Sequence, residues 1–294
     1  MKISEILAKK KTLSFEIFPP KREDETFTLI DRTIKQLSIY KPDYISVTYG
    51  ALGNTLSNTA MIARTIKENT GAEPLAHLTC VASTTDKVDS VCTELKNYGV
   101  ENILTLRGDI PKNTDTPIFS DFKHASDLAS YIKGKFNGQF GLAGACYPEK
   151  HPEADNLTSD IEFMKIKQDA GMEFFDSQLF FDNEVFYHFL LKARKAGITV
   201  PIIPGIMPVT NYAQLDRMIQ ITCCNVPLKL RNYFDRYKND KAAIEEIGLI
   251  FTSYQILDLI ANDVDGIHIY SMNKSDFISK LMDNIGYVAS GFFK

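Results

Sequence analysis

The 294-residue sequence lacks features that mark several classes of protein. No apolar stretch approaches the ~20 residues that a membrane-spanning helix needs, and the start of the chain lacks the apolar core and cleavage site of a signal peptide. Lysine and arginine are scattered, and the formal net charge is −4, so nothing indicates nucleic-acid binding. We therefore expect a cytoplasmic protein with no membrane and no nucleic-acid partner.

The cysteines form no Cys-x-x-Cys pair, and their odd number is typical of reduced thiols rather than of a disulfide framework. They are Cys80, Cys92, Cys146, Cys223 and Cys224. The histidines are dispersed, and the nearest pairing with a cysteine is His77 with Cys80. In a strand that spacing places two side chains on opposite faces. We therefore predict no metal site.

What the chain does have is a regular alternation of short apolar runs and longer segments with helical periodicity. The predicted strands are 13–18, 44–48, 74–79, 102–106, 140–147, 174–180, 200–206 and 266–270. The predicted helices are 24–39, 56–70, 84–98, 121–135, 158–170, 183–197, 211–223 and 275–289.

This alternation predicts an α/β protein of the (β/α)8 TIM-barrel class. We expect one catalytic domain over residues 1–294, with an extra helical insertion at 226–263 before the last strand. A doubly wound open sheet is the alternative. No Gly-x-Gly-x-x-Gly follows the first strand, which counts against the dinucleotide-binding form of that sheet.

Polar residues lie at the carboxyl ends of the predicted strands, where a barrel builds its active site. Glu16 lies inside an apolar run, and burial raises a carboxyl pKa, so this residue is a candidate general acid. A structural glutamate bonded to the backbone or to an arginine is an equal alternative. Thr48 offers a hydroxyl after the second strand. His77, in the third, is more often a hydrogen-bonded core residue than a ligand contact.

The fourth strand ends in Arg107, Gly108 and Asp109. Arg107 and Asp109 point the same way on an extended chain, and Gly108 permits close approach of the backbone to a ligand. They offer a cation for phosphate and an anion that could face a developing positive charge. After the fifth strand, prolines hold Tyr147 and His151 in extended geometry, which suits a planar cofactor as well as a stiff surface turn.

Further polar residues follow on the next helix and strand. Asp160 and Lys167 share one helical face, although Asp160 could simply interact with the helix dipole. Gln178 lies among phenylalanines and must find partners in the protein or in a ligand.

Read in order, these segments resemble the methylenetetrahydrofolate reductase family, in its short bacterial form with the catalytic domain only. The resemblance covers essentially the whole chain. It is carried by Phe15-Glu16-Ile17-Phe18-Pro19-Pro20, Val47-Thr48-Tyr49-Gly50, His77-Leu78-Thr79-Cys80, Leu106-Arg107-Gly108-Asp109, Tyr147-Pro148-Glu149-Lys150-His151-Pro152-Glu153-Ala154 and Ile203-Pro204-Gly205-Ile206-Met207-Pro208.

The resemblance implies a TIM barrel that binds FAD without the Rossmann glycine motif. The implied FAD contacts are Thr48, His77, Arg107, Gly108, Asp109, Ala125, Tyr147, His151, Asp160 and Lys167. The implied folate contacts are Glu16, Asp109, Gln178, Gln214 and Lys274.

The resemblance also implies an oxidoreductase that reduces 5,10-methylenetetrahydrofolate to 5-methyltetrahydrofolate in one-carbon metabolism and methionine supply. The reaction is ping-pong: NADH or NADPH gives a hydride to flavin N5 and leaves before the folate binds. Glu16 would protonate the departing folate nitrogen, and Asp109 would stabilise the iminium cation. A homo-oligomer is expected on the same basis.

The chain departs from the bacterial pattern at three positions. Lys274 stands where an arginine is usual, and it lacks the bidentate fork for a carboxylate. Phe163 and Ile166 stand where asparagine and arginine are usual, so contacts to the FAD phosphate or ribose are expected to differ.

Three other functions remain as alternatives at this point. They are a different FAD barrel that resembles proline dehydrogenase, a flavin-free pterin-binding methyltransferase, and a non-catalytic binding module. Polar groups at adjacent strand ends argue against the last, because such groups cost stability without a ligand.

Overall fold

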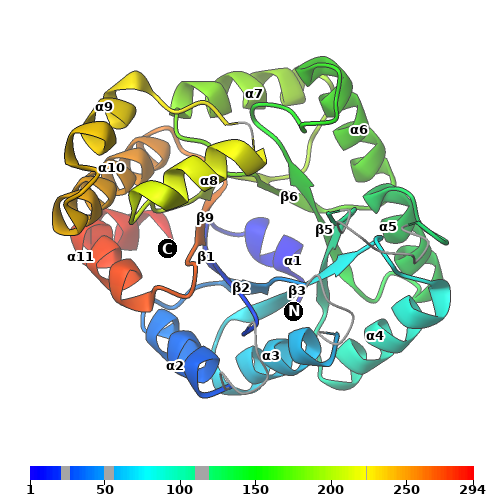
Figure 1. The fold of residues 1–294 in the computed structure, drawn as a ribbon. Coiled ribbons are helices and arrows are strands. Elements are labelled where there is room, and N and C mark those ends of the chain that lie inside the picture. The colour runs from blue at the N-terminus through cyan, green and yellow to red at the C-terminus, as the bar shows by residue number, and fades with distance from the viewer. Residues whose placement is uncertain (21–26, 50–55, 110–118, 223) are drawn as a thin grey trace.

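The computed structural model describes residues 1–20, 27–49, 56–109, 119–222 and 224–294. Figure 1 looks along a barrel of strands surrounded by helices. Gly50, part of one family motif, and Cys223 lie outside the described residues.

Nine parallel strands in the described part of the chain form one sheet in the order β7-β6-β5-β4-β3-β2-β1-β9-β8. They are β1 (Thr12–Ile17), β2 (Tyr44–Val47), β3 (Glu73–Thr79), β4 (Asn102–Leu106), β5 (Gly141–Cys146), β6 (Phe174–Ser177), β7 (Ile202–Ile203), β8 (Gly205–Ile206) and β9 (Gly266–Tyr270). This arrangement confirms the predicted TIM-barrel class.

The predicted seventh strand is divided into β7 and β8 at Pro204, which has no N–H to donate to a ladder. β7 pairs with β6, and β8 pairs with β9. The Pro204 carbonyl accepts a hydrogen bond from the amide of His268 at 3.0 Å. The two short strands therefore take the place of one and bring the ends of the sheet together in a nearly closed barrel.

The eight predicted helices are all present, and their ends within the described residues lie within a few residues of the predicted ones; residues 24–26 and 223 of the predicted helices lie outside the described residues. The helices are α1 (Ile3–Leu7), α2 (Phe27–Ser38), α3 (Leu56–Asn69), α4 (Thr85–Asn97), α5 (Ala125–Lys135), α6 (Leu157–Asp169), α7 (Asn183–Lys195), α8 (Tyr212–Thr222), α9 (Leu228–Tyr237), α10 (Lys241–Ala261) and α11 (Ser275–Phe292). The predicted insertion is α9 and α10. The short α1 was not predicted.

The strands are buried on both faces, which is why their sequences read as nearly continuous apolar runs. Their outward side chains pack against the helices in one large core. Their inward side chains near the amino ends form a separate apolar cluster that includes Tyr44, Leu75 and Phe174.

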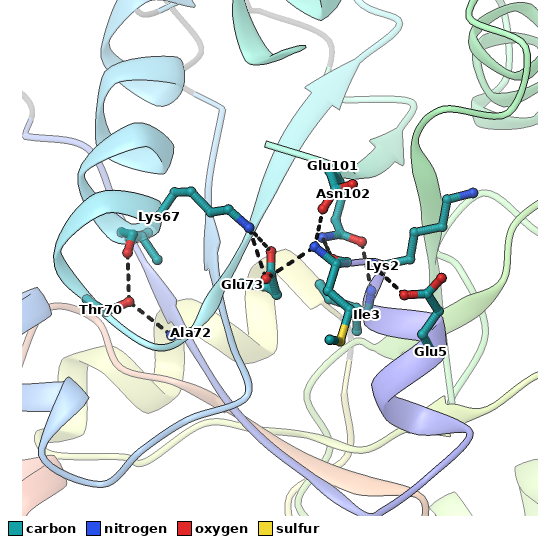
Figure 2. A network of polar contacts seen from close by, with 11 residues as sticks. Lys2, Ile3, Glu5, Lys67, Thr70, Ala72, Glu73, Glu101 and Asn102 are labelled. Carbon is teal, nitrogen blue, oxygen red and sulfur yellow. Dashed lines mark hydrogen bonds and ion pairs between the residues drawn. The ribbon is translucent and has the colours of Figure 1, made fainter. Parts of the chain in front are cut away.

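Helix α1 closes the amino end of the barrel, and Figure 2 shows its polar attachments. Ile3 is completely buried in the inner cluster. Its amide donates to Asn102 Oδ1 at 2.8 Å, and Asn102 Nδ2 donates to the Met1 carbonyl at 3.1 Å. Nearby, Lys67 and Glu73 form an ion pair at 2.8 Å. With this end closed, the opposite, carboxyl end of the strands is the one available to ligands.

The remaining global findings concern thiols and membranes. Four cysteines of the described chain are buried: Cys80, Cys92, Cys146 and Cys224. Within the same residues, we find no helix with the length and apolar character to cross a bilayer.

Candidate active site

A cluster of polar side chains lies inside the barrel around Glu16, which is only 7% exposed. Glu16 Oε2 lies 3.5 Å from His77 Nε2, 3.8 Å from His268 Nε2 and 3.5 Å from Ser46 Oγ. Strand register explains the grouping, because Glu16 of β1 is level with Ser46 of β2 and Tyr270 of β9. Among the described residues, the Glu16 side chain thus faces two histidines and a serine, and no arginine or backbone group is bonded to its carboxylate.

One layer towards the amino end lies a second polar group. Ser14, Tyr44 and His268 are level with one another on β1, β2 and β9. Ser14 Oγ is 2.8 Å from His268 Nδ1, and the Tyr44 hydroxyl donates to Asp176 Oδ1 at 2.7 Å. Asp176 is a second buried carboxyl inside the barrel.

The two histidines beside Glu16 differ in their tendency to carry charge. Burial lowers the pKa of His77 to about 4, because Glu16 offsets only part of the desolvation. Burial also disfavours charge on His268, but Asp176 and Glu16 outweigh it and raise the pKa of His268 above its ordinary value. At neutral pH the site therefore contains a neutral imidazole and, across from it, one that favours its proton.

The loop after β4 supplies a cation, a glycine and an anion. Gly108 has φ +85°, and a Cβ there would lie 2.9 Å from the Thr79 Cβ, so only glycine fits. Arg107 makes a bidentate ion pair with Glu153 at 2.6 and 2.7 Å. Asp109 is exposed, and no hydrogen bond or ion pair joins it to Glu16 within the described chain. Arg107 must leave Glu153, or share it, to bind a phosphate.

The loop after β5 joins helix α6 in one arrangement. The Tyr147 and His151 rings meet edge to face with centroids 4.8 Å apart. The His151 amide donates to Asp160 Oδ2 at 2.8 Å, so Asp160 holds this loop in addition to lying near a helix start. Lys167 Nζ donates to the Ala145 carbonyl at 2.9 Å and lies 5.8 Å from the Tyr147 ring centroid. Burial lowers the pKa of Lys167.

Other predicted contacts are placed as follows. Thr48 follows β2, and Ala125 is the buried first residue of α5. Gln178 follows β6, and its Oε1 accepts from the Leu179 amide at 2.9 Å, which leaves its amide nitrogen for another partner. Phe163 and Ile166, the departures on α6, are about half exposed, at 54% and 52%.

Gln214 and Lys274 meet through Thr210. Gln214 Oε1 accepts from the Thr210 hydroxyl at 3.0 Å, and Lys274 Nζ donates to the same hydroxyl oxygen. A cavity of about 540 Å³ lies beside Thr210 and Lys274, and its charged lining includes Arg32 and Lys280 as well as Glu245 and Asp276. This position suits a ligand carboxylate.

Sequence reasoning missed Ser14, Tyr44, Asp176 and His268. The available signal was alternation: polar or titratable residues two positions apart in a strand share a face. Ser14 with Glu16 and His268 with Tyr270 both follow it.

The family model described as methylenetetrahydrofolate reductase matches residues 2–286. The chain belongs to the methylenetetrahydrofolate reductase family. It is 34% identical to the 5,10-methylenetetrahydrofolate reductase of Escherichia coli (strain K12), over 93% of this chain and 90% of that protein. It is 36% identical to methylenetetrahydrofolate reductase 2 of Saccharomyces cerevisiae, over 93% of this chain.

The chain spans about half the length of the plant and yeast members of the family that it matches. For the Arabidopsis thaliana methylenetetrahydrofolate reductase (NADH) 1, 33% identical, the match covers 94% of this chain and 48% of that protein. Among solved structures, a Clostridium thermocellum protein that binds 5-methyl-5,6,7,8-tetrahydrofolic acid has a TM-score of 0.68 at 14% identity. The structural match covers 99% of each chain, and it supports the assignment of the barrel fold.

Proposed function

We propose that this chain is an FAD-dependent methylenetetrahydrofolate reductase that uses NADH or NADPH as electron donor. The observation that carries the proposal is the buried Glu16 carboxyl at the centre of the open barrel end, flanked by His77 and His268, in a chain of this family. We propose further that residues 1–294 act as one catalytic barrel domain. The homo-oligomer stays a prediction.

Residues of β3, of α6 and of the segments after β2, β4 and β5 fit a flavin dinucleotide. His77 Nε2 and the Tyr49 hydroxyl are buried without a hydrogen-bond partner among the described residues, so both have capacity for a ligand. Gly108 keeps the backbone free of a side chain, and Arg107, His151 and Lys167 supply donors for phosphates. When bound, FAD would take a hydride from the nicotinamide and return it to the folate.

The remaining proposed FAD contacts flank these groups. Thr48 and Ala125 offer a hydroxyl and a small side chain, Asp109 lies next to Gly108, and Asp160 keeps the Tyr147–His151 loop in place. The exposed Phe163 and Ile166 on α6 cannot supply polar contacts to the dinucleotide.

For the folate, this chain's residues have separate tasks. Glu16 holds the proton that the departing ring nitrogen needs, in a site that burial keeps dry. Asp109 places negative charge at the strand ends, where it favours a cationic substrate. The Gln178 side-chain amide nitrogen, which donates to no group among the described residues, can orient the ring, and the Gln214–Thr210–Lys274 group suits the folate carboxylate.

An anaerobic visible spectrum tests the proposal. We expect the purified protein to show a flavin spectrum that bleaches with NADH and returns with methylenetetrahydrofolate. A flavin that bleaches but does not return would keep a flavoenzyme and reject the folate, with proline as the next substrate to try. Protein that carries no flavin and does not bind added FAD would favour the flavin-free pterin barrel.

A further inference from the structure

Asp176 on β6 is a buried carboxyl that the proposed reaction does not use. It is 5% exposed. Its Oδ1 accepts the Tyr44 hydroxyl at 2.7 Å, while Oδ2 is buried and has no hydrogen-bond partner among the described residues. A buried carboxyl with one oxygen that accepts no hydrogen bond destabilises the fold unless a nearby positive charge compensates it.

The group that can compensate Asp176 is His268. Tyr44 connects the two, because its hydroxyl binds Asp176 and its ring stacks on His268 with centroids 5.9 Å apart at 11°. His268 in turn presents Nε2 to Glu16 Oε2 at 3.8 Å. Asp176, Tyr44, His268 and Glu16 thus form a continuous buried series from the barrel interior to the proposed acid.

We propose that Asp176 is a positioning residue for proton transfer at Glu16: its negative charge keeps a proton on His268, which re-protonates Glu16. The proposal rests on the proposed function. After Glu16 gives its proton to the folate nitrogen, the new carboxylate attracts the imidazolium, and His268 Nε2 moves from 3.8 Å to hydrogen-bond distance of Glu16 Oε2. The Nε2–H bond then breaks and an Oε2–H bond forms on Glu16. His268 becomes neutral and regains a proton from solvent, while Asp176 stays an anion throughout.

The electrostatics agree with this assignment. Burial disfavours the charged form of His268, and the negative charge of Asp176 is the first influence that opposes it, followed by Glu16, so that the pKa of the imidazole is raised. The charge of His268 in turn favours the ionised form of Asp176, against a burial that raises its pKa. His77, with its pKa lowered to about 4, has no proton to give at neutral pH.

The other titratable groups around Asp176 remain neutral near pH 7. Burial raises the pKa values of Tyr44, Cys146 and Tyr270 above their ordinary range. The titratable groups that interact with Asp176 from the surrounding strands are Glu16, Tyr44, Cys146, His268 and Tyr270. Among these groups, His268 is the base whose pKa the neighbouring carboxyls raise.

The test is a histidine NMR titration of the full chain with flavin bound, comparing wild type with Asp176→Asn. A nearby opposite charge shifts a pKa by ~1–3 units, so we expect the His268 titration to move down by at least ~1 pH unit in the variant. Tyr44→Phe removes only the hydroxyl that stabilises the Asp176 anion. This variant should lower the midpoint of the His268 titration by a smaller amount than Asp176→Asn. Thr105→Val, at a buried strand hydroxyl bonded to the Ala143 carbonyl, is the matched control and should leave it unchanged.

Kinetics provide the second readout. In Asp176→Asn, the alkaline limit of the folate half-reaction should move to lower pH by the same amount, while reduction by nicotinamide keeps its rate. An unshifted His268 titration in Asp176→Asn overturns the proposal, and if that variant does not fold, an unshifted Tyr44→Phe overturns it instead. If His268 shifts but wild type reduces no folate, the proposed function has failed, and the relay role fails with it.

Discussion

Glu16 is surrounded by groups whose protonation differs although they share one enclosed space. His77 is neutral because burial dominates, and His268 favours its proton because two carboxyls face it. Environment rather than residue type therefore assigns the roles of the two imidazoles. His77 has a ring nitrogen available to a ligand, and His268 can carry a positive charge beside Glu16.

Replacing Glu16 with glutamine tests the acid directly. Glutamine keeps the shape but carries no transferable proton, so the folate half-reaction should slow by ~10²–10⁴. Stopped-flow absorbance of the flavin measures both half-reactions, and reduction by nicotinamide is the internal control that should be retained. Two intact half-reactions would show that Glu16 is not the acid.

His77 should make stability depend on pH. Its pKa is about 4 in the folded chain and 6.5 in the unfolded chain, so the unfolded state binds more protons between these values. The contribution of neutral His77 to the free energy of unfolding is fully present above pH 6.5. It falls by up to about 3 kcal/mol as the pH drops to 4.

Urea unfolding at several pH values measures this effect. His77→Gln should lose less stability than wild type between pH 6.5 and 4. His188→Gln, at an exposed histidine, is the matched control and should follow wild type. Equal slopes for His77→Gln and wild type would contradict the neutral, buried state of His77.

At the scale of elements, the loops after the strands determine what the site can bind. The β4 loop turns at Gly108 in a left-handed conformation against the side chain of Thr79. The β5 loop is held to α6 by the bond between His151 and Asp160. Cations and rings from two consecutive loops consequently face one region, which neither loop provides alone.

Gly108→Ala should weaken both the fold and flavin binding. The left-handed φ costs an alanine about 1–2 kcal/mol, and the contact with Thr79 must be relieved by moving the loop. Gly138→Ala is the control, because Gly138 has φ +67° but no atom lies within 4 Å of the place that an added Cβ would take. Thermal unfolding and flavin fluorescence should separate the two variants. A Gly108→Ala protein that binds flavin as tightly as Gly138→Ala would show that the loop has room.

At the scale of the whole molecule, the two ends of the barrel have different tasks. Helix α1 and Asn102 close the amino end, far along the strands from the polar centre at their carboxyl ends. In such barrels, changes at the closed end affect stability and changes at the open end affect chemistry.

Asn102→Ala should therefore destabilise the chain and leave the half-reactions intact. It leaves the buried Ile3 amide without its acceptor, which costs about 1–3 kcal/mol. Asn97→Ala, the same substitution at an exposed position in α4, should have little effect on stability. Denaturant midpoints report the difference, and a changed folate rate at full flavin occupancy in Asn102→Ala would contradict the separation of the two ends.

Several features were readable in the sequence because they are local. The parallel strands are apolar on both faces, so runs such as 102–106 stand out, and the amphipathic helices between them follow a different period. Helix α1 was not predicted because five residues carry too little periodicity, and it is held by tertiary contacts through Ile3. The division of the seventh strand at Pro204 also depends on its two neighbours in the sheet.

The sequence alone determined the barrel class, the family and the residues at the strand ends, because strand periodicity and ordered motifs are properties of neighbouring residues. Only the tertiary structure decided which of those residues meet. Strand register placed His268 of β9 beside Glu16 of β1, and the closed barrel brought Asp176 of β6 close enough to raise the pKa of His268, although these residues are far apart in the chain. It also paired Arg107 with Glu153 and joined Gln214 to Lys274 through Thr210. Charge and proton affinity depend on distance and burial, and both are fixed only when the barrel closes.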